Sequence, residues 1–131
     1  MFLDASAITA IIVQEADWKE LTDKAEASDF PLTSPLSIYE ATLAVARLGD
    51  GSIETARDLV TEFLDRGRCK IIAIDSDIGT EAIAAFARFG KGRHRASLNM
   101  GDCFAYACAK VHRVPLLCKG DDFRHTDIQI A

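Results

Sequence analysis

The chain has 131 residues, 49% of them hydrophobic, and a formal net charge of −5 at neutral pH. No repeat or linker divides it, so we expect one compact domain over residues 1–131 whose core needs no disulfides. No apolar run is long enough to cross a bilayer, and the acidic balance excludes a protein that holds nucleic acid through its overall charge. Because the N-terminus lacks a basic segment followed by an apolar stretch, we expect a cytoplasmic protein with no membrane partner.

The cysteines and histidines form no metal-binding pattern. None of the cysteine spacings is C-x-x-C, and the three histidines are scattered along the chain. In a reducing compartment we therefore expect small buried thiols instead of disulfides or zinc ligands. The four cysteines are Cys69, Cys103, Cys108 and Cys118.

Short apolar segments alternate with longer helical patterns along the chain. The first half contains a predicted strand at 1–4, a helix directly after it, a helix at 17–28, an extended segment at 30–33, and helices at 34–49 and 52–67. The second half contains a predicted strand at 69–75, helices at 76–89 and 99–112, a strand at 114–118 and a short edge strand at 126–130. This alternation predicts an α/β fold with helices around a parallel sheet.

Capping residues mark several of the predicted helix ends. Ser34 offers a capping hydroxyl, Pro35 lies in the first turn, and Gly49 is suited to end the same helix. Ser52 and Ser76 are the expected caps of two later helices.

Asp4 lies where the first predicted strand meets a helix. A carboxylate at this place commonly caps the helix. The place also lies beyond the carboxyl end of a strand, where ligands gather in parallel sheets, so Asp4 is equally well placed to bind a metal ion. Ser6, two residues further on, is placed to hold a metal-bound water.

Two more acids border the apolar faces of predicted helices. Glu40 projects roughly 90° from the middle of the apolar stripe of its helix, so it borders the core. Asp102 lies in the first turn of the late helix, where a carboxylate meets the positive end of the helix dipole. Because apolar residues also cover the side of Asp102, its charge needs a partner such as a metal ion or a cluster of donors.

Asp121 and Asp122 follow the last central strand in the turn KGDDF. Acids in such turns commonly serve turn chemistry, and neighbouring side chains point in different directions, so we expect one of the two to face a cleft. These acids can converge with Asp4, Glu40 and Asp102 at one edge of the sheet. Clustered carboxylates repel one another unless a cation neutralises them, and oxygen ligands favour Mg²⁺ or Mn²⁺.

One basic segment contrasts with the acidic chain. Residues 88–95 read RFGKGRHR, with four cations, His94 and no acid. Such a segment can meet a polyanion where a bound metal offsets the carboxylates. His94 itself is a poor general base, because a flexible loop does not fix its position.

Four segments carry a family resemblance. FLDASAI, YEATLAV, GKGRHRASLNMGDCFAYACAK and PLLCKGDDFRHTDI occur in this order over nearly the whole chain. Together they resemble PIN-domain proteins, and specifically the VapC toxins of VapBC toxin–antitoxin systems. The resemblance implies a three-layer α/β/α fold with a central, mainly parallel sheet. It also implies metal-dependent endoribonuclease activity that leaves 5′-phosphate and 3′-hydroxyl ends.

The resemblance assigns roles to individual residues. It implies that Asp4, Glu40 and Asp102 are the first three acids of the active site, with Asp4 and Asp102 as ligands of Mg²⁺ or Mn²⁺. The fourth acid is Asp121 or Asp122. Many family members have a D-x-D-F turn where this chain reads GDDF, and Asp122 is slightly favoured.

Other positions match supporting residues of the family. Ser6 matches a small hydroxyl residue that supports metal-bound water, and Asn99 falls where an amide lines the cleft. The candidate RNA phosphate contacts are Arg88, Lys91, Arg93 and Arg95. The resemblance also implies a homodimer and a cognate VapB antitoxin, whose C-terminal segment crosses the acidic groove and can pair an arginine with the carboxylates.

Two other interpretations stay open. A PIN domain that is catalytically weak or inactive can still bind RNA or a partner, because small errors in geometry abolish catalysis. A receiver-type signalling domain is also a small α/β fold, with Asp75 as its phosphoacceptor. Such domains carry an acidic pair after the first strand, however, whereas Asp4 stands alone.

Overall fold

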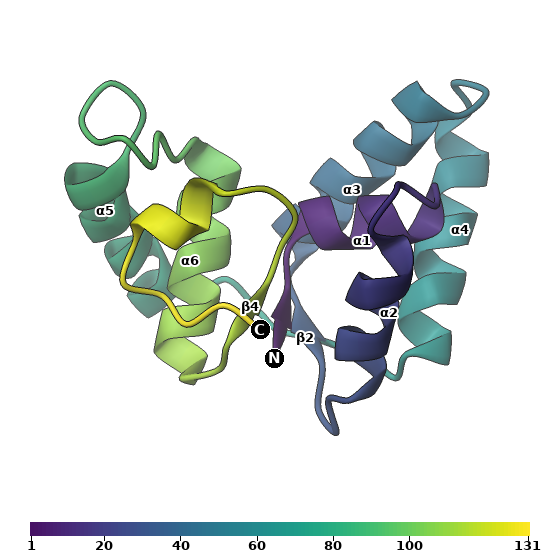
Figure 1. Ribbon diagram of the computed structural model, residues 1–131, viewed down its shortest axis with the longest axis horizontal. Coiled ribbons are helices and arrows are strands. Elements are labelled where there is room, and N and C mark those ends of the chain that lie inside the picture. The colour runs from purple at the N-terminus through teal and green to yellow at the C-terminus, as the bar shows by residue number, and fades with distance from the viewer.

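The computed structural model describes residues 1–131 and shows helices on both sides of a small sheet (Figure 1). In chain order the elements are β1 (Phe2–Leu3), α1 (Ala5–Ile12), α2 (Trp18–Glu26), β2 (Leu32–Thr33), α3 (Pro35–Leu48), α4 (Ile53–Arg66), β3 (Lys70–Ile71), α5 (Ser76–Phe89), α6 (Met100–His112), β4 (Leu116–Leu117) and the 3-10 helix η1 (Asp122–His125). The order of the predicted helices and central strands is confirmed. None of the helices has the length and apolarity needed to cross a membrane.

The four strands form one parallel sheet in the order β3-β2-β1-β4. Phe2 of β1 pairs with Leu32 of β2 on one side and with Leu116 of β4 on the other. Because all strands run in the same direction, their carboxyl ends meet at one edge of the sheet. The backbone N–H of Asp4 donates to Leu117 O at 3.0 Å, so the end of β1 lies beside the end of β4.

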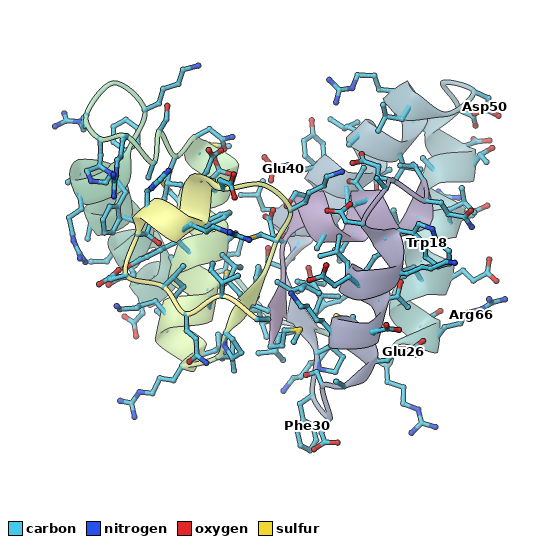
Figure 2. All side chains as sticks on the ribbon, in the orientation of Figure 1. Trp18, Glu26, Phe30, Glu40, Asp50 and Arg66 are labelled. Atoms are coloured by element: carbon cyan, nitrogen blue, oxygen red, sulfur yellow. The ribbon has the colours of Figure 1, made fainter.

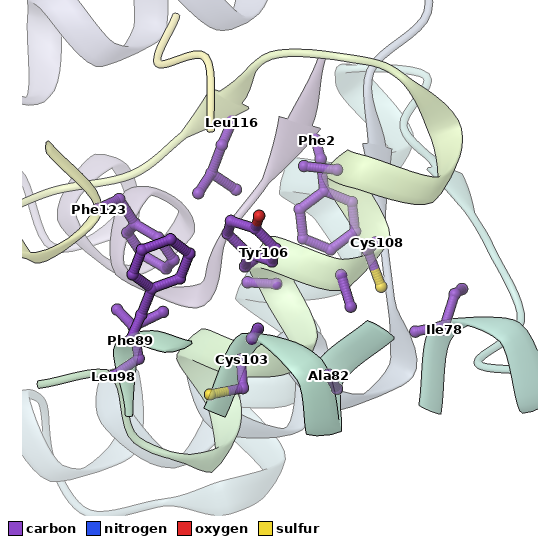
Figure 3. Close-up of a cluster of buried hydrophobic side chains, with 14 of the residues drawn as sticks. Phe2, Ile78, Ala82, Phe89, Leu98, Cys103, Tyr106, Cys108, Leu116 and Phe123 are labelled. Carbon is purple, nitrogen blue, oxygen red and sulfur yellow. The ribbon is translucent and has the colours of Figure 1, made fainter. Parts of the chain in front are cut away.

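Alternating side chains of the strands divide the core into two parts. Phe2 and Leu116 belong to a cluster with α5 and α6 on one face, whereas Leu3 and Leu117 belong to a cluster with α1 to α4 on the other. Successive side chains of a strand point to opposite faces, which explains this division. Figure 3 shows the first cluster, with the buried ring of Tyr106 near Phe2 and Leu116. The predicted three-layer α/β/α fold is confirmed.

Most of the predicted helix caps are confirmed. Ser34 and Ser52 accept backbone N–H bonds from the first turns of α3 and α4, and Gly49 follows the last residue of α3. The prediction for α5 is wrong, because Ser76 is already helical and Asp75 is the cap. The Asp75 carboxylate accepts two backbone N–H bonds at 3.0 and 3.1 Å, which satisfies two donors that the helix start leaves free. The group that a receiver domain would phosphorylate therefore caps a helix.

All four strands are shorter in the structure than the predicted extended segments, and the predicted edge strand is absent. The strand predicted at 69–75 is limited to β3, an edge strand whose two residues are both exposed. The edge strand predicted at 126–130 is wrong as a strand, since this segment forms only one parallel bridge, between Ile130 and Leu116. Hydrogen bonds of Asp127 hold the start of the segment against α6 instead.

The four cysteine thiols are free, and Cys103 and Cys108 are buried as expected. Cys69 and Cys118 are half-buried. Burial raises the pKa of the Cys69, Cys103 and Cys108 thiols to about 11 and that of Cys118 to about 12. All four side chains are therefore protonated at neutral pH and behave as small hydrophobic groups.

Asp127 ties the C-terminal segment to α5 and α6. It accepts a hydrogen bond of 2.6 Å from the buried Tyr106 hydroxyl, and its other oxygen lies 3.0 Å from Arg88 and 3.2 Å from Lys110. The hydrogen bond from Tyr106 and the two cations hold the pKa of Asp127 well below its usual range. We refer to this group as the Asp127 latch. It fixes the chain directly after η1.

Replacing Tyr106 by phenylalanine keeps the buried ring and removes the hydrogen bond to Asp127. We expect the free energy of unfolding to fall by about 1 to 2 kcal/mol, because hydrogen bonds to charged groups contribute more than neutral ones and Asp127 is partly screened by solvent. Guanidinium denaturation followed by circular dichroism measures the change. A variant as stable as the parent would contradict a stabilising role for the latch.

Candidate active site

Asp4 joins the end of β1 to the start of α1. Its backbone is extended, and its carboxylate caps α1 by accepting the Ser6 N–H at 3.0 Å and the Ser6 hydroxyl at 2.5 Å. The residue is only 4% exposed. Burial raises the pKa of Asp4, and the hydrogen bonds from Ser6 oppose the rise. Asp4 is therefore both the cap of α1 and a buried carboxylate at the end of β1.

Ser6 links the ends of the two central strands. Its hydroxyl donates to Asp4 and accepts the backbone N–H of Lys119, just after β4, at 2.9 Å. A hydroxyl has one donor and two acceptor positions, so one acceptor position of Ser6 stays available for a water molecule. This fits the supporting role that the sequence predicts for Ser6.

Asp102 lies in the first turn of α6 and forms a reciprocal cap with Asn99. The Asp102 N–H donates to Asn99 Oδ1 at 3.0 Å, and Asp102 Oδ2 accepts the Asn99 N–H at 2.8 Å. Burial raises the pKa of Asp102 to about 6, with further contributions from the charges of Asp4 and Asp122. Asn99 thus orients the Asp102 carboxylate through this capping box.

Glu40 extends from the middle of α3 toward the same two acids. Figure 2 labels it between the two helical layers. Burial, followed by the charges of Asp4 and Asp102, raises the pKa of Glu40 to about 7. The sequence predicts a residue that borders the core, and the half-buried Glu40 confirms this.

Asp121 and Asp122 have different surroundings, although they are adjacent. Asp121 is highly exposed and pairs with Arg124 at 3.2 Å. The charge of Asp122 acts on Asp102 and on Cys118, raising the pKa of both groups. Both residues are exposed, but the charge of Asp122 reaches Asp102, whereas Asp121 is paired with Arg124.

The acidic site, as we call Asp4, Glu40, Asp102 and Asp122, contains no ion pair. Every ion pair of an acidic side chain in the structure involves other residues. No three potential ligands form a ready-made metal cage. Mg²⁺ is commonly held by one or two carboxylates together with water molecules, so this all-oxygen donor set fits a hard divalent cation. Asp4, which is buried, and Asp102, which is half-buried in the first turn of α6, are suited to hold it.

The cations of the basic segment differ in whether they form an ion pair. Arg88 belongs to the Asp127 latch and lies 4.6 Å from the Phe89 ring centroid. The other cations, Lys91, Arg93 and Arg95, are exposed and form no ion pair, although Arg93 lies 5.6 Å from the Phe86 ring centroid. His94 accepts the Ala96 N–H through Nδ1 at 3.1 Å, so it stabilises the loop.

A model of the PIN domain matches residues 1–129. The chain belongs to the PIN-domain family. Among curated relatives, it is 41% identical to Ribonuclease VapC30 of Mycobacterium tuberculosis over 129 residues, covering 98% of this chain and 95% of the relative. It is 43% identical to Ribonuclease VapC of Mycolicibacterium smegmatis, covering 98% and 97%. It is 41% identical to VapC ribonuclease R02377 of Rhizobium meliloti, covering 97% and 98%.

A solved structure supports the fold of this PIN domain. It is described as a toxin-antitoxin complex from Klebsiella pneumoniae, and the match has a TM-score of 0.72. The alignment covers 99% of this chain and 95% of the other, at 16% sequence identity. At this identity the likeness concerns the fold.

Sequence reasoning missed two features of this PIN domain site. Lys119 pairs with Glu15 and Asp17, which fixes the turn after β4 next to α1 and α2. Gly101 lies in the first turn of α6 and contacts Glu40 closely. The only signal in the sequence was a glycine at a helix position where alanine is more favourable.

The pKa values of the acidic site predict how the stability of the metal-free PIN domain depends on pH. The pKa of Glu40 rises from 4.5 to about 7 on folding, and that of Asp102 from 3.8 to about 6. At pH values between the unfolded and folded pKa values of these groups, the folded chain binds more protons than the unfolded chain. The free energy of unfolding therefore falls as pH rises. In a chelator, we expect a lower thermal midpoint at pH 8 than at pH 5. Glu40→Gln should flatten the fall above pH 6, and an equal fall in both proteins would contradict the assignment.

Proposed function

We propose that the chain is a VapC-type toxin, a single PIN domain that hydrolyses RNA phosphodiester bonds with Mg²⁺ or Mn²⁺. The main support is the acidic site, where four carboxylates from different elements lie at the carboxyl edge of a parallel sheet without a cationic partner. The curated relatives whose sequences align with nearly the whole chain are named ribonucleases. An oxygen-lined, anionic site needs a cation before it can accept an anionic phosphodiester.

Asp4 and Asp102 would hold the divalent ion. When bound, the ion would lower the pKa of water and stabilise charge on the leaving oxygen. The Glu40 carboxylate would take a proton from the attacking water. Ser6 Oγ can accept a hydrogen bond from water and so help orient it. Water oxygen attacks phosphorus, the bond to the 3′-oxygen breaks, and that oxygen takes a proton from solvent while Glu40 releases its own to solvent. The products carry 3′-hydroxyl and 5′-phosphate ends.

Lys91, Arg93 and Arg95 are the proposed RNA phosphate contacts. They are exposed, carry no ion pair, and lie in the loop that leads into α6 and hence toward Asp102. Figure 1 shows this loop next to the start of α6. The sequence also made Arg88 a candidate RNA phosphate contact, but its ion pair in the Asp127 latch favours a structural role.

Replacing Asp4 or Asp102 by asparagine should abolish metal-dependent RNA cleavage. An amide binds Mg²⁺ more weakly than a carboxylate, so we expect the rate to fall by about 100-fold or more. The measurement is cleavage of a labelled RNA with Mg²⁺, with Mn²⁺ and with chelator, together with circular dichroism to check the fold. Parent-like cleavage by both variants would contradict the proposed site.

The adjacent acids supply a matched control for this experiment. Asp122→Asn should reduce cleavage, whereas Asp121→Asn should retain it, because the Asp121 carboxylate is exposed and paired with Arg124. The two substitutions change net charge equally. The reverse result would assign the fourth acid to Asp121. RNA binding by a parent that cuts under no condition would favour a PIN domain that binds without cleaving.

Replacing Arg93 and Arg95 together by alanine should weaken RNA binding and reduce its dependence on salt. Each lost phosphate contact on a single strand changes the slope of log K against log salt by about 0.7, so we expect about 1.4 for the pair. Fluorescence anisotropy at several salt concentrations measures the slope. As a control of equal charge, Arg57 and Arg66 of α4 are replaced by alanine, and there the slope should not change.

The proposed protein partner is a VapB-type antitoxin. A cavity of about 640 Å³ lies between α1, α2 and α4, with Trp18 and Phe63 among its apolar lining residues and Glu26 and Arg66 among its charged ones. Figure 2 shows Trp18, Glu26 and Arg66 on this side of the molecule. An amphipathic antitoxin segment can occupy this groove. An arginine elsewhere in the antitoxin can pair with the acidic site.

We propose that the toxin also forms a homodimer. Apolar side chains are exposed on α3 at Tyr39 and Leu43 and on α5 at Ile83 and Phe86, with Tyr39 59% and Ile83 75% exposed. Exposed apolar side chains that gather on a surface are typical of association. Dimerisation through α3 and α5 would cover them.

A further inference from the structure

Gly101 occupies the first turn of α6, directly before Asp102. Its backbone has no positive φ, unlike that of Gly51, Gly92 and Gly120, so the conformational freedom of glycine is not needed there. Glycine also disfavours a helix relative to alanine. Another constraint must therefore explain the absence of a side chain at this buried position.

The space that a side chain at residue 101 would fill is taken by Glu40. A Cβ atom built on Gly101 would lie 2.5 Å from Cδ of Glu40 and closer still to both carboxylate oxygens. These three atoms are the nearest neighbours of that position, and none of them belongs to the backbone. The carboxylate from α3 thus packs directly on the backbone of α6.

We propose that Gly101 is a positioning residue that lets the Glu40 carboxylate reach the acidic site. The proposal rests on the proposed function, since it assigns Gly101 a part in the same site. Any larger residue at this place competes with the carboxylate for the same volume. The Glu40 side chain is flexible and half-buried, so it can turn toward solvent without moving either helix.

The substitution Gly101→Ala tests this role in the full chain. Alanine suits a helix, and the clash involves only the end of a flexible side chain, so we expect a thermal midpoint equal to or above that of the parent. The Mn²⁺ affinity, measured by calorimetry, and the RNA cleavage rate should each fall at least tenfold. A crystal structure of metal-free Gly101→Ala should show the Glu40 carboxylate turned away from Asp4 and Asp102.

Gly79→Ala is the matched control. Gly79 also lies early in a helix, α5, with an ordinary φ, but a Cβ built there has no neighbour within 4 Å. We expect this variant to bind Mn²⁺ and cleave RNA as the parent does. Equal losses in Gly79→Ala and Gly101→Ala would overturn the proposal, because the losses would then come from changing a helix glycine.

A double-mutant cycle separates a positioning role from a general structural one. Glu40→Ala removes the carboxylate and leaves room for a Cβ at residue 101. In this background, Gly101→Ala should change neither Mn²⁺ affinity nor cleavage further, whereas independent effects would multiply and would overturn the proposal.

The crystal structure of the Gly101→Ala variant keeps the two proposals distinguishable. If the parent neither binds Mn²⁺ nor cleaves RNA, the proposed function fails. The position of Glu40 in Gly101→Ala still decides the packing claim. A Glu40 carboxylate that stays in its parent position beside the added methyl group would overturn that claim.

Discussion

Burial of carboxylates that the fold holds near one another is the constraint on which the site depends. Burial raises the pKa values of Asp4, Glu40 and Asp102, and for Glu40 and Asp102 the charges of neighbouring acids add to the rise. In the metal-free chain, hydrogen bonds from Ser6 and Asn99 hold the carboxylates of Asp4 and Asp102 in place. A cation that binds there relieves the repulsion, so binding and proton release are coupled.

The carboxylates owe their orientation to ordinary local structure. Asp4 caps α1 and Asp102 closes a capping box at the start of α6, so each carboxylate has one oxygen fixed by backbone donors. The parallel sheet then brings the two helix starts to the same edge. The Asp127 latch holds the segment after η1 against α6. Local capping and the sheet topology therefore act together in building the site.

The helices and the central strands were predictable because their signals are local. Ser34, Pro35 and Gly49 mark the ends of α3 within a few residues of the bonds that they make. Apolar pairs such as Phe2 and Leu3 indicate a strand buried on both faces. The prediction of a strand at 126–130 was wrong. The hydrogen bond from Tyr106 to Asp127 joins residues 21 positions apart, so no pattern in the sequence near Asp127 indicates it.

By itself, the sequence determined the order of the elements, most of the caps and the acids that could meet at one edge. The tertiary structure decided that the charge of Asp122 reaches Asp102 while Asp121 pairs with Arg124, and that Arg88 is held by Asp127. It also decided that Glu40 packs on Gly101. The physical reason is that charge interactions and steric exclusion depend on distance and burial, which long-range packing sets, whereas capping and strand alternation depend on neighbours in the chain.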